Sequence, residues 1–311
     1  MIKKISLFLF IFALSLLPLF ADFKSDYEKY IKSENIKKLE VLLPEWEKAE
    51  PNNPEMFIAY FNYYLLKGRS SGLTLDTVPP ESGPAIPFSD PDTGETVGYI
   101  GGQTSYDKTN TERALEYLNK GLAIAPERLD MHFGQISILG QINEYDRMAE
   151  KIIEVFRVAK KINHKWLWSN NEPMGDDAEN IMLDSINDYH AHLLTAKDTA
   201  AKEAEMQVCL AQTKAYPKNI YAYNFLGAAY MQTGQDEKAL QAFLSAEKID
   251  PSDGIVLGNI GKWYADHGDT KNAKKYYKKC LKIRIRVYGN LPETGLTHWI
   301  KNNYTEFQNE Y

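Results

Sequence analysis

The chain is poor in cysteine and has no cluster of basic residues. Only Cys209 and Cys280 occur in 311 residues, which excludes a disulfide framework and a zinc site made of paired cysteines. The formal net charge is −6, from 42 acidic and 36 basic side chains. An acidic chain without a basic run is a poor match for nucleic acid or an anionic membrane. With 19 glycines, 14 prolines and 44% hydrophobic residues, the chain can instead form a large folded core.

The motifs of common enzyme classes are also missing. There is no glycine-rich phosphate loop, no zinc-protease helix motif and no nucleophile elbow. Asp184, Asp188 and His192 lie on one face of an expected helix and could bind a metal, but we favour a solvated face. His190 and His192 point about 200° apart on a helix, so they cannot both reach one ion. We predict no catalytic residue, no metal site and no cofactor.

Residues 220–287 contain two copies of one pattern, laid end to end. Gly227 and Gly261 are 34 residues apart, and so are Ala239 and Ala273. Small residues at these positions let two antiparallel helices approach closely, and the aromatic residues of the pattern fill the wider space beside them. The first copy consists of Tyr223, Leu226, Gly227, Tyr230, Ala239, Phe243 and Ala246, and the second of Leu257, Ile260, Gly261, Tyr264, Ala273, Tyr277 and Cys280.

This pattern resembles the tetratricopeptide repeat, TPR. The resemblance implies an all-α, right-handed solenoid of about six helix pairs, and weaker copies extend it over residues 22–311. It is most specific in residues 220–253 and 254–287. The resemblance also implies a C-terminal capping helix, which we expect at residues 297–308 after a loop that begins beyond Ile283.

The two cysteines fall at core positions of the repeats. Cys209 stands where the family has an aromatic residue, and Phe61 stands where it has glycine, so the early repeats depart from the family's packing. Cys209 and Cys280 lie two repeats apart, which separates their sulfurs by roughly 20 Å, whereas a disulfide needs Cα atoms within about 7 Å. We predict two buried, unbridged thiols that act as small apolar groups.

The N-terminus has the pattern of a secretory signal peptide at residues 1–21. Lys3 and Lys4 precede an apolar run from Ile5 to Phe20, and Ala21 provides a small residue at the cleavage site. An uncleaved membrane anchor is the alternative, but the run is short for a membrane span. We therefore expect export to the periplasm or the extracellular space, with no stable membrane span after cleavage. The mature chain would carry a net charge of −8.

Two segments interrupt the repeats. Residues 69–111 contain five prolines and six glycines, and we predict a turn at Asp90–Gly94 within a hairpin from Ala85 to Ile100. Because the insertion is too apolar for plain disorder, we expect it to fold back over the solenoid, although a surface insertion without a role is the alternative. Trp166 and Trp168 lie in a second loop. They could form an aromatic platform for a ligand, but we favour a plug between neighbouring repeats.

In the TPR family, the first helix of each repeat faces a concave groove. Asn224 and Asn259 could pair there with the backbone of an extended peptide, because a side-chain amide matches both N–H and C=O. Phe225 and Met231 could accept apolar side chains. Some TPR proteins capture a terminal carboxylate, but only Asn259 matches that residue set here, so we do not predict it. The groove positions are Tyr221, Asn224, Phe225, Ala228, Met231, Gln232, Ile255, Asn259, Lys262 and Asp266.

These features favour a non-catalytic scaffold of the cell envelope that binds a protein or an extended peptide through its groove. The first alternative is a small-molecule-binding accessory of a transport system, in which residues 69–111 and the two tryptophans would close a pocket. The second alternative is an enzyme. The oligomeric state is left open.

Overall fold

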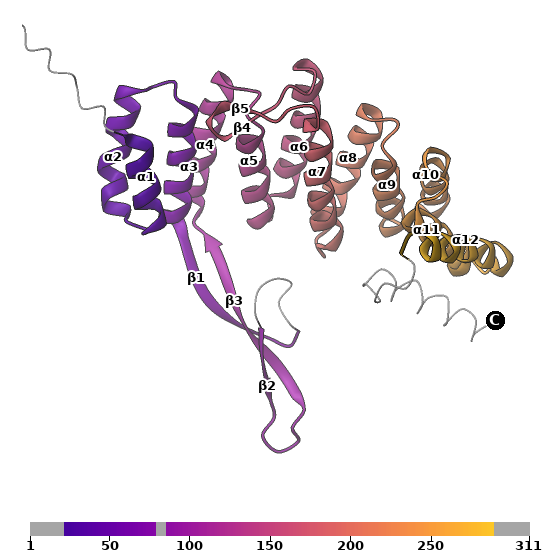
Figure 1. The fold of residues 1–311 in the computed structure, drawn as a ribbon. Coiled ribbons are helices and arrows are strands. Elements are labelled where there is room, and N and C mark those ends of the chain that lie inside the picture. Colours follow the sequence, from indigo (N-terminus) through magenta and orange to yellow (C-terminus); the bar gives the residue numbers. More distant parts are fainter. Residues whose placement is uncertain (1–21, 79–84, 289–311) are drawn as a thin grey trace, which may run out of the picture.

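A computed structural model describes residues 22–78 and 85–288. Within these ranges, twelve α-helices form consecutive antiparallel hairpins that stack in a row (Figure 1). This is the predicted all-α solenoid. The predicted signal peptide (1–21) and capping helix (297–308) lie outside the described residues. The helices are α1 (Phe23–Lys32), α2 (Ile36–Ala49), α3 (Pro54–Gly68), α4 (Lys108–Ile124), α5 (Leu129–Gln141), α6 (Tyr145–Lys161), α7 (Ala178–Thr195), α8 (Thr199–Ala215), α9 (Ile220–Gln232), α10 (Asp236–Ile249), α11 (Gly254–Asp266) and α12 (Thr270–Tyr288).

Several of these helices begin at a short polar residue whose side chain caps the N-terminus. Asn219 accepts a hydrogen bond from the backbone N–H of Ala222 at the start of α9, and Asp253 caps α11 in the same way. Gly234 and Gly268 follow α9 and α11 with φ angles of 68° and 74°, a conformation that costs glycine little. One boundary differs from the prediction, because α12 continues past Ile283 to Tyr288.

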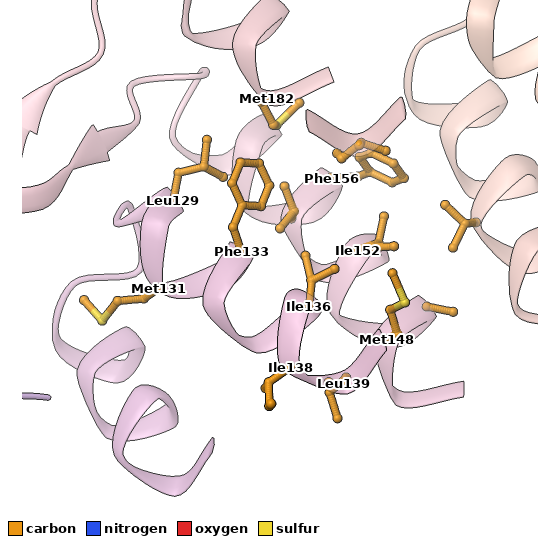
Figure 2. Close-up of a cluster of buried hydrophobic side chains, with 14 of the residues drawn as sticks. Leu129, Met131, Phe133, Ile136, Ile138, Leu139, Met148, Ile152, Phe156 and Met182 are labelled. Atoms are coloured by element: carbon orange, nitrogen blue, oxygen red, sulfur yellow. The ribbon is translucent and has the colours of Figure 1, made fainter. Parts of the chain in front are cut away.

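Apolar side chains from successive hairpins form the core. Figure 2 shows the central cluster, which includes Ile136 of α5, Ile152 of α6 and Met182 of α7. In the two clear repeats, a Cβ atom on Gly227 would lie 2.4 Å from the ring of Phe243, and one on Gly261 would lie 2.8 Å from the ring of Tyr277. The close helix crossings expected at these two glycines are therefore confirmed.

Residues 69–76 and 85–106 form a three-stranded antiparallel arm in the order β1-β3-β2. The strands are β1 (Arg69–Asp76), β2 (Ala85–Ser89) and β3 (Thr96–Tyr106). The predicted hairpin is present as β2 and β3, and Gly94 donates to the carbonyl of Asp90 in its turn. Strand β1 was not expected. Asp107 caps α4, so this helix begins before residue 111.

The arm extends away from the helices (Figure 1), so the prediction that it folds back over the solenoid is wrong. Leu73 and Leu75 of the arm are 80% and 72% exposed. Strands β1 and β3 pair along their length, from Arg69 opposite Tyr106 to Asp76 opposite Tyr99. Strand pairing within the arm therefore holds its three strands together without cover from the helices.

Within residues 22–78 and 85–288, no helix combines the length and the apolar character that a membrane span requires.

Candidate functional site

The predicted groove residues lie on α9 and α11, the first helices of the two clear repeats. Tyr221 and Ile255, near the N-terminal ends of these helices, are 41% and 40% exposed, and Gln232 is also exposed. The remaining predicted residues of the two helices are half-buried, except for exposed Asp266. They are Asn224, Phe225, Ala228, Met231, Asn259 and Lys262.

Asn224 and Asn259 form a bridge between the two helices. The Nδ2 group of Asn259 donates a hydrogen bond of 2.8 Å to Oδ1 of Asn224. This bond uses one polar group of each amide. This bond does not use the Nδ2 group of Asn224, which is a donor, or the Oδ1 atom of Asn259, which is an acceptor.

Other predicted groove residues have partners within the protein. The ring of Phe225 stacks on the imidazole of His190, with centroids 4.5 Å apart, and Met231 packs against the core cluster that contains Phe243. These two side chains are less available to a ligand than the sequence suggested. Gln232 donates to the carbonyl of Leu194, and Lys262 forms an ion pair with Asp266 at 2.9 Å.

The two tryptophans do not join the α9–α11 surface. Trp166 is 1% exposed and lies in the central core, with its ring 5.7 Å from that of His132. It fills space between hairpins, as we favoured. Trp168 is 41% exposed and its ring lies 6.4 Å from Phe133 of α5. Trp168 belongs to a small loop made of β4 (Leu167–Trp168), the 3-10 helix η1 (Ser169–Asn171) and β5 (Glu172–Pro173).

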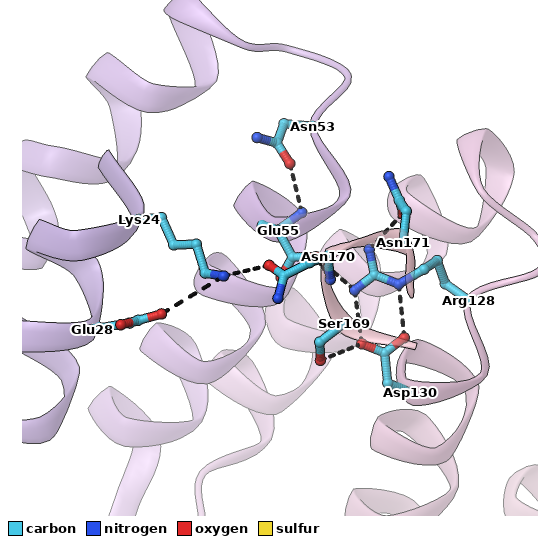
Figure 3. Close-up of polar contacts among 9 residues, drawn as sticks. All are labelled: Lys24, Glu28, Asn53, Glu55, Arg128, Asp130, Ser169, Asn170 and Asn171. Atoms are coloured by element: carbon cyan, nitrogen blue, oxygen red, sulfur yellow. Dashed lines mark hydrogen bonds and ion pairs between the residues drawn. The ribbon is translucent and has the colours of Figure 1, made fainter. Parts of the chain in front are cut away.

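This loop is anchored by a buried arginine that the sequence analysis did not identify. The side chain of Arg128 is fully buried and reaches Asp130 and Glu55 at 2.8 Å each. Its Nη1 group donates to Asn171 at 3.0 Å, as Figure 3 shows. The backbone N–H of Asn170 donates to Glu55 at 2.7 Å, and Lys24 of α1 donates to the Asn170 side chain.

Lys24 of α1, Glu55 of α3 and Arg128 at the start of α5 each contact this loop or one another, so the loop connects the three helices. Each charged group has a partner of opposite sign or an amide, which is the arrangement that makes a buried charge tolerable. The arrangement resembles a structural brace rather than a catalytic site. A single arginine in an unremarkable Glu-Arg-Leu-Asp stretch gives no sequence signal for such a contact.

A second buried polar cluster lies where α7, α8 and α9 meet. His190, Glu205, Cys209 and Gln212 are all 0% exposed. The Nδ1 atom of His190 lies 2.9 Å from both carboxylate oxygens of Glu205, and its Nε2 atom lies 2.6 Å from Oε1 of Gln212. The thiol of Cys209 donates to Glu205 at 3.0 Å.

This cluster revises the sequence-based view of Cys209. Cys209 and Cys280 are both buried and not bridged, as predicted. Cys209, however, is not merely a small apolar group, because burial and the neighbouring Glu205 carboxylate raise the pKa of its thiol well above the usual value. The available sequence signal was the spacing of Glu205, Cys209 and Gln212, which puts them on one face of α8.

Asp184, Asp188 and His192 of α7 are exposed, which confirms the prediction that they form a solvated face.

Two surface hollows in the described residues lie away from the predicted groove positions. One of about 370 Å³ lies between α9 and α10 and includes Tyr223, Tyr230 and Gln241. Another of about 420 Å³ lies between α7 and the α8–α9 connection and includes Glu179 and Tyr216. Both are open to solvent, and neither is a closed apolar cavity with converging polar groups. They give no support to a small-molecule pocket.

Comparison with known proteins agrees with the repeat pattern. Residues 220–253 and 256–293 each match a family model described as tetratricopeptide repeat. The chain is 29% identical over 106 residues to anaphase-promoting complex subunit 3 from Schizosaccharomyces pombe. That alignment covers 33% of this chain and 16% of the yeast protein, so the chain corresponds to a small part of that relative.

Several solved helical-repeat structures are similar. A MamA fragment from Desulfovibrio magneticus RS-1 is 21% identical, with a TM-score of 0.34, over 57% of this chain and 88% of that one. YrrB, described as a TPR protein with an unusual peptide-binding site, is 16% identical, with a TM-score of 0.35, over 61% of this chain and 83% of that one. The family models and the hairpin geometry together establish that this chain contains tetratricopeptide repeats within an all-α solenoid.

Proposed function

We propose that this protein is a non-catalytic scaffold of the cell envelope, and that it binds an extended segment of a partner protein along α9 and α11. The observation that carries the proposal is the Asn224–Asn259 bridge. It leaves one amide donor on Asn224 and one amide acceptor on Asn259, and a peptide bond offers the complementary acceptor and donor. Recognition through the backbone would let the groove accept segments of varied sequence.

Apolar groups at the ends of α9 and α11 would add to this contact. Tyr221 and Ile255 are the exposed large hydrophobic side chains among the predicted groove residues of α9 and α11. Each lies near the start of its helix, so a bound segment could cover both after crossing the asparagine bridge. Burial of such side chains on binding stabilises a complex, while hydrogen bonds to the bridge fix the orientation of the segment.

The cell-envelope part of the proposal depends on the N-terminal sequence. Lys3 and Lys4, the following apolar run and Ala21 have the order expected of a signal peptide. We expect the protein isolated from its own cells to begin at Asp22 and to fractionate with the envelope or the medium. Mass spectrometry of the intact protein tests this directly, and an uncleaved protein found in the cytosol would contradict it.

The binding site is tested with a double variant, Asn224→Ala and Asn259→Ala. The wild-type protein is used to isolate partners from an extract of its own cell envelope, and segments of those partners are then synthesised as peptides. We expect the double variant to bind the best peptide about tenfold more weakly in calorimetry, corresponding to about 1.4 kcal/mol. Circular dichroism checks that the variant remains folded.

The matched control is Gln241→Ala on α10. Gln241 is exposed and borders the hollow between α9 and α10, outside the groove helices. The control should bind the peptide as the wild type does. If the double variant binds the peptide as tightly as the wild type, the proposed site is wrong. If the control loses more affinity than the double variant, the binding site lies on α10 instead.

A further inference from the structure

The buried cluster of His190, Glu205 and Cys209 has the composition of a metal site. Its imidazole nitrogen, carboxylate oxygen and sulfur atoms all lie within 4.8 Å of one another. His190 comes from α7, while Glu205 and Cys209 are one helical turn apart on α8. The three donor types together match the ligands that zinc takes in proteins. We propose that these three residues bind one Zn²⁺ ion inside the solenoid.

The surroundings of His190 fit a metal ligand. Zinc-bound histidines almost always donate their second ring N–H to an acceptor, which fixes the ring orientation. Here the Nδ1 atom faces Glu205 and Cys209, and the Nε2 atom lies 2.6 Å from Oε1 of Gln212. A neutral imidazole that coordinates zinc through Nδ1 would carry its proton on Nε2 and donate it to Gln212. Both oxygens of Glu205 lie 2.9 Å from Nδ1 and therefore face the imidazole. A carboxylate bound through both oxygens would make four donor atoms together with Nδ1 of His190 and Sγ of Cys209.

Charge balance supports the same assignment. All three side chains are fully buried, and an isolated charge at such a place is very costly. Zn²⁺ would be neutralised by the Glu205 carboxylate and the Cys209 thiolate, with His190 neutral. On binding, the thiol proton of Cys209 and any proton on Nδ1 of His190 leave to solvent. The alternative is a metal-free cluster in which protonated His190 pairs with Glu205.

The site would link the metal to the rest of the solenoid. Phe225 of α9 stacks on the ring of His190 at 4.5 Å and covers it from the side of the next repeat. Zinc would therefore fix the α7–α8 hairpin and, through this stack, the position of α9. Because the three ligands are buried, the ion would enter during folding, as structural zinc commonly does.

Cobalt provides the test, because a thiolate bound to Co²⁺ gives a strong charge-transfer band. The purified protein is unfolded in denaturant that contains a reductant and a chelator. The reductant and the chelator are then removed, and the protein is refolded with Co²⁺. We expect one Co²⁺ per chain with the thiolate band, displacement of Co²⁺ by Zn²⁺, and a higher unfolding midpoint with Zn²⁺ than with the chelator. A refolded wild-type protein that shows no thiolate band would overturn the proposal, whatever the variants do.

Two cysteine variants locate the metal. Cys209→Ser should lose the thiolate band and bind Zn²⁺ more than tenfold more weakly. Cys280→Ser is the matched control, since Cys280 is also buried but its thiol donates to the carbonyl of Gly254 on α11, away from the cluster. Its cobalt spectrum should equal that of the wild type. A band that persists in Cys209→Ser contradicts the assignment. Gln212→Leu should keep the band and weaken Zn²⁺ binding about 10- to 100-fold.

Discussion

The solenoid and the β arm use similar apolar residues in opposite ways. In the solenoid, Leu39, Ile136 and Leu257 are 0% exposed, because each lies between neighbouring helices. In the arm, Leu73, Leu75 and Ile86 are 80%, 72% and 65% exposed. The helices depend on one another for their stability, whereas the arm is held by strand pairing within itself. Changes inside the solenoid should therefore cost stability, and changes on the arm should leave it intact.

One face of the arm gathers these apolar side chains. Leu75 and Ile86 both lie opposite Ile100 in the sheet, and Leu73 and Phe88 continue the same face along β1 and β2. Residues directly opposite each other project to one side of a sheet, so this face is largely apolar. An exposed apolar face of this kind is typical of contact surfaces, but the solenoid does not cover it.

The largest expected effect is the loss of the buried arginine. Arg128→Met would leave Glu55 and Asp130 without their buried cation, and we expect a loss of about 3 kcal/mol in the free energy of unfolding. Denaturant unfolding followed by circular dichroism measures it. The control is Arg69→Met at the base of the arm, where the exposed ion pair with Glu34 should contribute less than about 1 kcal/mol. Equal losses in the two variants would contradict the contrast.

Glycine substitutions compare the two regions at the level of a single side chain. Gly227→Val would force a branched side chain against Phe243 at the closest helix crossing, and should cost about 2 kcal/mol. Gly72→Val on β1 meets no atom within 4 Å and should change the unfolding free energy by about 0.5 kcal/mol or less. Thermal unfolding of both variants is sufficient, and a Gly227→Val protein as stable as the wild type would refute the predicted crowding.

The exposed leucines of the arm provide the next comparison. The double variant Leu73→Ser and Leu75→Ser should change the unfolding free energy by about 0.5 kcal/mol or less, because both side chains already face solvent. Leu257→Ala in α11 should instead cost about 2 kcal/mol or more. If the arm variant loses as much stability as Leu257→Ala, its apolar face is covered in solution, and sedimentation analysis would show whether a second copy covers it.

The smallest expected effect is a change in pH dependence. The hydrogen bond from Arg147 lowers the pKa of Glu112 below its usual value. Because the carboxyl pKa is lower in the folded chain, the stabilisation is present above the unfolded pKa of about 4.3 and is lost as the pH falls. Since both side chains are partly exposed, we expect only a few tenths of a kcal/mol. Arg147→Gln should flatten the stability profile below about pH 5, as measured by urea unfolding.

Much of the helical architecture was predictable, because its signals are local. The spacing of Gly227, Ala239 and their repeats 34 residues later requires close helix crossings, and the glycines at 234 and 268 end their helices by backbone conformation. The turn at Asp90–Gly94 was also predicted from its residue types and is present. The availability of the predicted groove residues was harder to predict, since Phe225 stacks on His190 and Met231 packs against the core.

The sequence by itself determined the helical hairpins, their period and the residues at their crossings, because these depend on neighbours a few positions apart or one repeat away. Only the tertiary structure decided that Arg128 meets Glu55, that His190 meets Glu205 and Cys209, and that the arm projects from the solenoid. These outcomes depend on the packing of separate hairpins and on the pairing of β1 with β3. Such contacts join residues with no fixed spacing in the chain, so no local pattern encodes them.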